Sequence, residues 1–503
     1  MRKLLAIALV SIMATGYASA GTRDNDDSCD VKVTPAATLL LPYFEVDVNP
    51  LVPGRTTLFT ITNVTRYPQI AHVTLWTDWA YPVLNFNVFL TGYDVQSINL
   101  YDVLVNGIVA PPSGTTSATT PGAMSASNNT GNPNLRSPLD CGGVPGNVPQ
   151  AIMGPVRNAL TIGVFKPTSG PTCSTAGGVH SNAIGYATID LVASCTSRMP
   201  IDPLYYTADL LYDNVLIGDY QHLGVSPAGT GAGPYEAGGN PMVHIRAVPE
   251  GGGAGSVVGT SLPFTFYDLY TPATNRVIDR RQPLPATYAA RFIQGGPSKL
   301  ATNITMWREA ETRPGASCAS YVNNAVMVIG EIVRFDEHEN PTTMNCFGFF
   351  GCGGPPTFPA TAALNTASAN FPNIAFGPDV AGWIYFNASN CGNTNYSVTT
   401  DIGGAQGPSN KPGSLAPKGG TTVYGPRPSQ GWITVSMFGK VGTSSLTAEF
   451  DAASLGNGCS PAAFLTSSKP IGPAGGAFVC PPGTTLTDGT TTLCTGTNGN
   501  PTP

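Results

Sequence analysis

The sequence predicts an all-β protein with two or more antiparallel β-sandwich units and long loops rich in Gly, Pro, Ser and Thr. Three observations lead to this prediction. Apolar residues come in short bursts of strand length, with no sustained 3.6-residue period. Val, Ile, Thr, Phe and Tyr, which favour strands, dominate the bursts. Turn formers separate them, since the 503 residues include 59 Gly and 46 Pro.

The first element is an export signal. Arg2 and Lys3 precede the apolar run 4–13, and the small residues Ala18-Ser19-Ala20 follow it. A basic head, a short apolar centre and a small-residue exit are typical of a Sec signal peptide. We therefore expect residues 1–20 to be removed and the mature protein to be periplasmic, cell-surface or extracellular. No later apolar run reaches the ~18 residues of a membrane-spanning helix, so we expect no transmembrane span in the mature chain.

Residues 21–250 are predicted to form the first β-sandwich domain, with a long loop at 106–150. That loop carries only two charged residues, Arg136 and Asp140, among many Gly, Pro, Ser, Thr and Asn residues. Strands are expected at 38–44, 56–61, 72–79, 83–90, 95–100, 159–165, 183–192 and 243–248.

Residues 251–345 are predicted to form a second β-rich domain. Residues 346–455 either continue it or form a third β-rich region, and 456–503 form a low-charge tail that contains three cysteines. In the second half of the chain, strands are expected at 264–267, 286–293, 301–307 and 326–335.

A short internal repeat suggests that two of the units are related. Val73–Asp78 (VTLWTD) resembles Ile304–Glu309 (ITMWRE) when the two segments are aligned. Because six residues of β-pattern can match by chance, this alignment is compatible either with duplication or with common strand patterning.

The charge of the chain limits its partners. Charged residues make up 11% of the sequence and the formal net charge is −6, so no basic surface is expected to hold nucleic acid. We therefore predict that the chain has no nucleic-acid partner.

All eleven cysteines follow the signal peptide. Export favours disulfides, since oxidising compartments allow them to persist. Thiolate metal sites are disfavoured because no Cys-x-x-Cys pair is present. Cys346 and Cys352 are disulfide candidates, being close enough in sequence to close a small loop.

Two aromatic residues are the best candidates for ligand binding. In the predicted strand 72–79, alternation puts Val73 and Leu75 toward the core and Trp76 on the opposite face with His72 and Asp78. Trp76, together with Tyr81 at the strand exit, could present an aromatic platform to a sugar ring or a partner protein. Burial of these rings is the competing interpretation.

Asp336 and His338 are candidate metal ligands. They lie in the segment 336–339 (Asp-Glu-His-Glu), and oxygen ligands in a loop of an exported β-protein could bind Ca²⁺. A solvated turn is the alternative, because consecutive residues of an extended segment point in opposite directions. No other cofactor is expected.

Enzyme motifs give no support for catalysis. The sequence lacks Gly-x-Ser-x-Gly, His-Glu-x-x-His and the phosphate-binding Gly-x-x-x-x-Gly-Lys-Ser/Thr. We therefore expect an exported non-catalytic protein that acts in binding, in adhesion or as a structural assembly component, with self-assembly, a surface partner or carbohydrate as its interactions. The alternative is a secreted hydrolase that acts on polysaccharide through a carboxylate pair, a constellation that leaves no sequence motif.

Overall fold

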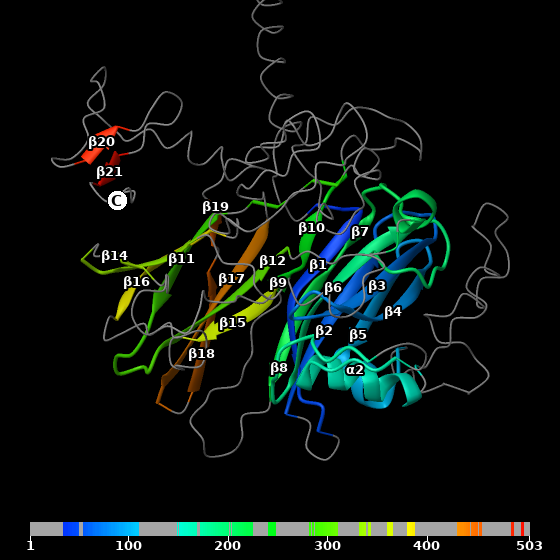
Figure 1. Ribbon diagram of the computed structural model, residues 1–503, viewed down its shortest axis with the longest axis horizontal. Coiled ribbons are helices and arrows are strands. Elements are labelled where there is room, and N and C mark those ends of the chain that lie inside the picture. The colour runs from blue at the N-terminus through cyan, green and yellow to red at the C-terminus, as the bar shows by residue number, and fades with distance from the viewer. Residues whose placement is uncertain are drawn as a thin grey trace, which may run out of the picture.

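A computed structural model of the chain describes a β-rich protein with little helix (Figure 1). The described residues are 34–49, 54–109, 148, 150–167, 172–200, 202, 204–224, 240–247, 281–282, 284–285, 287–309, 331–338, 341–343, 360–365, 380–387, 430–442, 444–450, 452–454, 484–486 and 494–496. The predicted signal peptide, most of loop 106–150, the strand expected at 264–267, both Cys346 and Cys352, and most of the tail lie outside these residues.

The first ten strands form two antiparallel sheets, which we call unit 1 (residues 34–247). One sheet has the order β10-β1-β6-β3-β4, and the other has the order β5-β2-β8-β9, with β7 also paired to β2. The strands are β1 (Thr38–Val46), β2 (Arg55–Asn63), β3 (Gln69–Thr77), β4 (Pro82–Leu90), β5 (Val95–Asn99), β6 (Ala183–Val192), β7 (Leu216–Ile217), β8 (Asp219–Gly224), β9 (Asn240–Pro241) and β10 (Val243–Ile245).

The next nine strands form two further antiparallel sheets, which we call unit 2 (residues 287–454). Their orders are β14-β13-β16-β11-β19 and β15-β12-β17-β18. The strands are β11 (Thr287–Ile293), β12 (Ala301–Arg308), β13 (Glu331–Asp336), β14 (Pro341–Thr343), β15 (Thr361–Asn365), β16 (Ala381–Asn387), β17 (Gly431–Val441), β18 (Ser444–Phe450) and β19 (Ala453–Ser454). A separate hairpin pairs β20 (Thr484–Leu486) with β21 (Cys494–Gly496).

The predicted all-β, antiparallel class is confirmed. In each unit, side chains from both sheets enter one shared apolar cluster, as expected for sheets that pack face to face. The cluster of unit 1 includes Leu41 and Val73 from one sheet and Phe59 from the other. That of unit 2 includes Phe386 from one sheet and Ile304 from the other. The finer sandwich assignment and the domain boundaries stay predictions.

One predicted strand is a helix. Residues 159–165 were expected to be extended, but α2 (Gln150–Ile162) includes most of them. Met153, Val156 and Leu160 recur at helical spacing and pack into the apolar cluster of unit 1. Two π-helical turns, η1 (Asp102–Asn106) and η4 (Tyr205–Asp209), complete the described elements. Within the described part of the chain, no helix has both the length and the apolar character that spanning a membrane requires.

The two units have the same topology. Strands β1 to β6 occupy the same sheet positions as β11 to β16, and β8, β9 and β10 occupy those of β17, β18 and β19. Every one of these pairings is antiparallel in both units. Strand β7 pairs with the end of β2 and corresponds to the first residues of β17. Unit 2 therefore repeats the whole strand order of unit 1.

A close contact between three strands recurs in both units. Phe44 is opposite Gly185 in unit 1, and Phe292 is opposite Gly382 in unit 2. A Cβ atom on Gly185 would lie 2.1 Å from the carbonyl oxygen of Trp76 and 2.7 Å from the Phe44 ring, and on Gly382 the corresponding distances, to the Phe335 carbonyl and the Phe292 ring, are 2.1 and 2.8 Å. Glycine is thus required at the same place in each unit.

A threonine makes the same hydrogen bonds in both units. The Thr57 hydroxyl accepts from the backbone N–H of Glu45 at 3.1 Å and donates to the carbonyl of the same residue at 3.3 Å. The Thr302 hydroxyl does the same with Ile293, at 2.9 and 2.8 Å. The residue bonded by the threonine, Glu45 in unit 1 and Ile293 in unit 2, directly follows the phenylalanine of the close contact. The units therefore correspond in residue detail as well as in topology.

The repeat seen in the sequence aligned the wrong strands. It matched residues of β3 with residues of β12, whereas β12 corresponds to β2 by its sheet position and by Thr302. The β3 strand corresponds to β13. The resemblance of Val73–Asp78 to Ile304–Glu309 is therefore shared strand patterning, although the units themselves are related.

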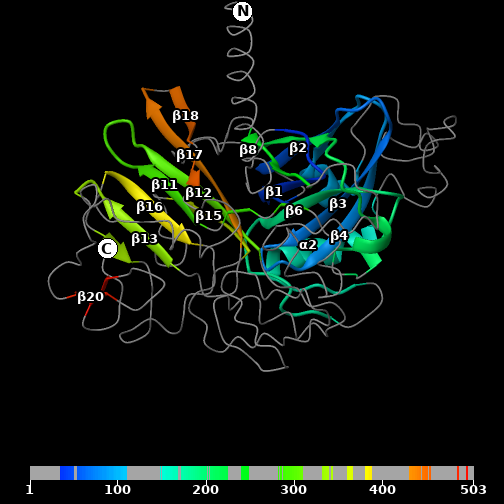
Figure 2. The ribbon, with the colours of Figure 1, turned by 90° about the horizontal axis from the view of Figure 1, so that it is seen from above.

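The two units are joined by a buried interface. Trp76 and Tyr186 lie on the outer face of unit 1 and stack with ring centroids 5.6 Å apart and planes 2° apart. Trp307 of unit 2 packs edge-on against Tyr186 at 5.9 Å. The Thr361 hydroxyl donates to the Pro42 carbonyl at 2.6 Å. Figure 2 shows β12 and β15 on the side of unit 2 that faces unit 1, and β13 and β16 on the far side.

Candidate functional site

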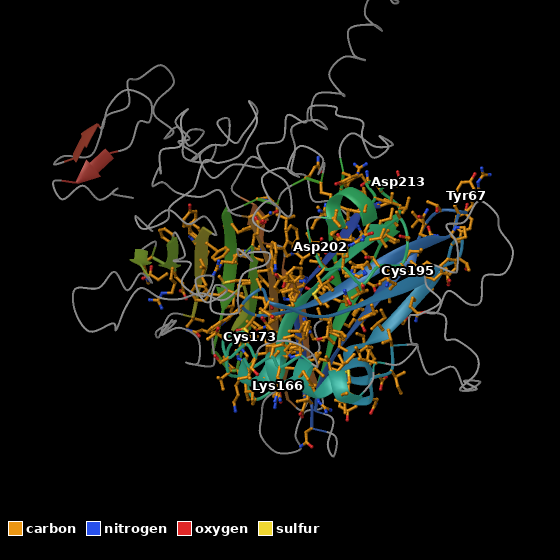
Figure 3. All side chains as sticks on the ribbon, turned by 45° about the vertical axis from the view of Figure 1, so that its right-hand side comes forward. Tyr67, Lys166, Cys173, Cys195, Asp202 and Asp213 are labelled. Atoms are coloured by element: carbon orange, nitrogen blue, oxygen red, sulfur yellow. The ribbon has the colours of Figure 1, made fainter. Side chains whose placement is uncertain are left out.

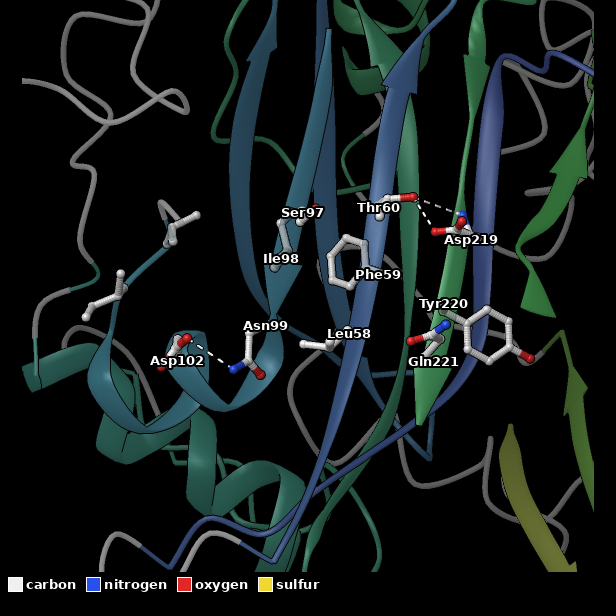
Figure 4. A pocket seen from close by; sticks show the side chains of 12 residues that line it. Leu58, Phe59, Thr60, Ser97, Ile98, Asn99, Asp102, Asp219, Tyr220 and Gln221 are labelled. Carbon is white, nitrogen blue, oxygen red and sulfur yellow. Dashed lines mark hydrogen bonds between the residues drawn. The ribbon is translucent and has the colours of Figure 1, made fainter. Parts of the chain in front are cut away.

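A cavity of about 300 Å³ lies over the outer face of strands β5, β2 and β8 of unit 1. Strand alternation explains its lining, because Phe59 points into the core while Leu58 and Thr60, its neighbours on β2, point outward. The lining consists of Leu58, Phe59, Thr60, Ser97, Ile98, Asn99, Asp102, Ile108, Val109, Asp219, Tyr220 and Gln221 (Figure 4).

Hydrogen bonds hold both carboxylates of this cavity. The Thr60 hydroxyl donates to Asp219. The Asn99 amide donates to Asp102 at 3.1 Å, and the Asn106 amide donates to its other oxygen at 3.0 Å. Figure 4 shows Asp102 and Asp219 at opposite ends of the row of labelled residues. The two carboxylates are therefore separately held rather than paired.

Two polar side chains of the cavity remain open to a ligand. Ser97 on β5 and Gln221 on β8 are exposed, and neither side chain has a hydrogen-bond partner among the described residues. Together with the exposed edge of Leu58 they offer neutral donors and acceptors beside apolar surface. This combination suits an uncharged polar ligand better than a charged one.

The predicted aromatic platform is not exposed. Trp76 is 0% exposed, because unit 2 covers the outer face of β3, and its Nε1–H donates to Thr188 at 2.8 Å. Tyr81 is half-buried against Phe165, at 5.6 Å between ring centroids, and burial raises the pKa of its phenol. Alternation correctly placed Val73 and Leu75 in the core, but the opposite face is buried as well.

His72, on the same face, is part of a sealed polar cluster. It is fully buried, opposite Asp190 in the β3–β6 register, and its Nδ1–H donates to Asn87 at 2.9 Å. Burial lowers the pKa of His72 despite the nearby carboxylates. A neutral, enclosed imidazole of this kind fixes the fold and has no access to substrate.

A buried ion pair completes this cluster. Arg281 and Asp190 are both 0% exposed, and Nη1 lies 2.9 Å from the carboxylate. The same carboxylate also accepts from Thr38 at 2.6 Å and from Tyr205 at 2.7 Å. Strands β1 and β6, the turn η4 and the segment before unit 2 are thus held together through one aspartate. Nothing in the composition or spacing of the sequence signals this pairing, which joins residues 91 positions apart.

A second His–carboxylate pair lies near the end of α2. His180 Nε2 is 2.9 Å from Asp78, which also accepts from the backbone N–H of Gly178 at 2.9 Å. Asp78 is almost fully buried and His180 is 27% exposed. The backbone carbonyl of Asp78 accepts from Ala360 of unit 2 at 2.5 Å. The pair anchors a loop and the interface between the units. The strand alternation put Asp78 on one face with His72, and it gave no sign of His180 as the partner of Asp78.

Asp336 and His338 form a turn. The carboxylate of Asp336 accepts from the backbone N–H of His338 at 2.8 Å, and the His338 side chain is exposed. Among the described residues, no group of three or more metal-ligating side chains is present. Metal binding by this pair stays a prediction.

Two cysteines of unit 1 each form a disulfide bond. Cys173 follows α2 and packs in the apolar cluster of unit 1, whereas Cys195 packs against the separate apolar cluster that contains Trp76 and Trp307. Figure 3 labels both. The predicted loop between Cys346 and Cys352 lies outside the described residues.

Comparison with known proteins adds no family assignment to this geometry. No family model, curated protein or solved structure matches the chain.

Proposed function

We propose that the chain is an exported, non-catalytic protein of the cell surface or extracellular space, acting in binding, adhesion or structural assembly. The observation that supports this proposal most is the repetition of one β unit along the chain, with the two units sealed together by aromatic rings. β-rich modules of this kind are common in extracellular binding and structural proteins. Export itself rests on the signal peptide predicted at residues 1–20.

The state of three of the five histidines also favours a non-catalytic role. A general base needs an imidazole within reach of substrate and a pKa near the working pH. His72 and His222 are fully buried and burial lowers the pKa of both, that of His222 to about 3. His244 is buried and bonded on both ring nitrogens, to Thr34 at 2.8 Å and to Gly218 at 3.2 Å.

Fractionation of the source cells tests the proposal. We expect the mature chain, cut after Ala20, in the cell-surface or extracellular fraction by intact mass. A full-length chain that retains residues 1–20 in the cytoplasm would contradict it. A substrate screen with the same purified protein tests the alternative, a secreted hydrolase. Turnover of any polysaccharide would favour that alternative.

The cavity over β5, β2 and β8 supports carbohydrate as a second candidate interaction. Its open Ser97 and Gln221 side chains could bond sugar hydroxyls, and Leu58 could contact a ring face. Calorimetric titration with neutral oligosaccharides would test this, with Gln221→Ala expected to weaken binding about tenfold, the loss of one good hydrogen bond. Gln69→Ala, which changes a half-buried glutamine outside the cavity, is the matched control.

The same cavity allows a direct test of the hydrolase. If Asp102 and Asp219 were its acid and base, Asp102→Asn and Asp219→Asn would each abolish turnover while leaving binding in place. For a binding protein we expect no turnover in any form of the chain, and at most a modest change of affinity in the two variants.

A further inference from the structure

The contact between the units has two complementary sides. The acceptor side is the outer face of unit 1 around the stacked pair Trp76 and Tyr186. The donor side is one end of a sheet of unit 2, where β12 finishes and β15 and β17 begin. It carries Trp307, Thr361 and Trp432, which pack on or next to that face.

Unit 2 has an acceptor side of its own. Phe335 and Trp383 occupy the positions of Trp76 and Tyr186, since Phe335 pairs with Trp383 beside Gly382 as Trp76 pairs with Tyr186 beside Gly185. The rings stack at 4.2 Å with planes 8° apart. Both rings of unit 2 are only half-buried, whereas those of unit 1 are sealed. Figure 2 shows β13 and β16 facing away from unit 1.

Unit 1 has a donor side of its own. We align the two units by superposing Thr57 of β2 on Thr302 of β12. The strand pairings then put Val95 of β5 at the position of Thr361 of β15, and Ile217 of β7 at the position of Trp432 of β17. Val95 is 57% exposed, and its neighbours Tyr93 and Tyr67 are 72% and 54% exposed. Figure 3 shows Tyr67 at the outer edge of the molecule.

The turn that carries Tyr93 is strained. Its φ of 59° lies in the left-handed region, which costs a non-glycine residue about 1 kcal/mol. Gly92 before it is in close contact with the backbone of Arg66, since a Cβ atom there would lie 2.3 Å from that carbonyl oxygen. An aromatic ring that is held in a strained turn and left in solvent is more simply explained by a partner than by folding.

We propose that copies of this chain associate head to tail, with the donor side of unit 1 in one copy docking on the acceptor side of unit 2 in the next. The new contact joins the surfaces that correspond to those in contact within the chain, with Thr62 at the position of Trp307 and with Tyr67, Tyr93 and Val95 packing against Phe335 and Trp383. Because it joins two different surfaces, it does not close on itself and extends into rows or filaments. This inference rests on the proposed non-catalytic role and names its partner as a second copy.

Sedimentation velocity of the purified mature chain tests the proposal, with iodoacetamide present so that free thiols cannot cross-link copies. We expect the mean mass to rise with concentration through dimers to larger species. Val95→Asp on the donor side and Trp383→Ser on the acceptor side should each abolish every species beyond the monomer. Val179→Asp, at an 81% exposed valine outside both surfaces, is the matched control and should still assemble.

Mixing the two variants distinguishes this contact from other modes of association and from misfolding. The Val95→Asp chain keeps its acceptor side and the Trp383→Ser chain keeps its donor side. An equimolar mixture should therefore form dimers and nothing larger. Tyr93→Ser offers a second donor variant that keeps Val95, and it should behave like Val95→Asp.

Three results would overturn the proposal: a wild-type chain that stays monomeric at all concentrations, assembly that persists in both variants, or a mixture that stays monomeric although both variants melt like wild type. None of these affects the proposed function, since a monomer at the cell surface would still be a binding protein. Conversely, cytoplasmic retention would contradict the function while leaving self-association intact.

Discussion

Units 1 and 2 share their strand order, their glycine contact and their threonine bridge, yet they differ in what covers their outer sheets. In unit 1 the aromatic pair is fully buried under unit 2, beside the ion pair of Asp190 and Arg281. In unit 2 the corresponding pair, Phe335 and Trp383, is half-buried, and the residue that corresponds to Asp190 is the neutral Asn387. Topology is thus conserved where the core requires it, while buried charge is found where one unit covers the other.

The largest expected effect comes from breaking the buried ion pair between Asp190 of unit 1 and Arg281. Arg281→Ala leaves the Asp190 carboxylate buried without its cation, which should lower the free energy of unfolding by about 3–5 kcal/mol. Urea denaturation followed by fluorescence measures this. The matched control is Arg55→Ala, because Arg55 pairs with Glu45 at 2.8 Å but is 42% exposed, and it should cost less than about 1 kcal/mol. Equal costs would contradict the distinction drawn between sealed and open faces.

The glycine contact should break both units alike. Gly185→Ala and Gly382→Ala each bring a Cβ atom within 2.1 Å of a backbone oxygen, so we expect each to cost about 1–3 kcal/mol or prevent folding. Thermal unfolding of the two variants measures the cost. Gly154→Ala in α2, where a Cβ atom would meet nothing within 4 Å, should be neutral or stabilising. A large cost in one unit only would argue against their equivalence.

The two units should differ in how one position, His222 in unit 1 and Met437 in unit 2, contributes to the pH dependence of stability. His222 of unit 1 corresponds to Met437 of unit 2, since each faces the bridging threonine. Burial, helped by the charge of Arg55, lowers the pKa of His222 to about 3. The unfolded chain, with an ordinary pKa of about 6.5, takes up a proton first. The stability contributed by neutral His222 is therefore complete above pH 6.5 and is lost as the pH falls toward 3.

The expected loss is about 1.4 kcal/mol per pH unit, or about 2 kcal/mol by pH 5. His222→Met, which installs the unit 2 residue, should make the dependence of unfolding free energy on pH shallower over this range. His338→Met replaces an exposed histidine and serves as the matched control. An unchanged slope in His222→Met would mean that folding does not lower the pKa of His222, and would contradict the prediction.

The smallest expected effect is a difference between the two threonine bridges. Thr57→Val and Thr302→Val each leave a backbone N–H without its partner, at a cost of about 1–3 kcal/mol. Thr57 also lies 3.0 Å from Nδ1 of His222, so its replacement should cost about 1 kcal/mol more than that of Thr302. Denaturant titration of both variants measures the difference, and a larger cost at Thr302 would contradict it.

Local patterns predicted the strands of unit 1 well. The expected strands 38–44, 56–61, 72–79, 83–90 and 95–100 agree with β1 to β5 within a few residues. The alternation that put Val73 and Leu75 in the core follows from strand geometry, which is a property of the chain itself. No strand was expected at β7, β8 or β9, and α2 was missed because Gly154 and Pro155 within it disguise the helical spacing of Met153 and Val156.

Features that depend on distant residues escaped prediction. The correspondence between the units rests on a few dispersed residues, such as Gly185 and Gly382. Because the loops between them differ in length, these residues are not a constant distance apart in the sequence, and a simple alignment does not find them. The cavity brings together β5, β2 and β8, whose pairing no local pattern specifies. The exposure of Trp76 depended on whether another unit lies above it.

The sequence by itself determined the all-β class, many of the strand positions and the inward faces of those strands, because these depend on neighbours one or two residues away. Tertiary structure alone decided the shared topology of the two units, the burial of Trp76, the pairing of Asp190 with Arg281 and the surfaces that remain open. These properties depend on which distant segments of the chain pack together. The free energy of a buried aromatic ring or ion pair is set by those tertiary contacts rather than by the residues adjacent in sequence.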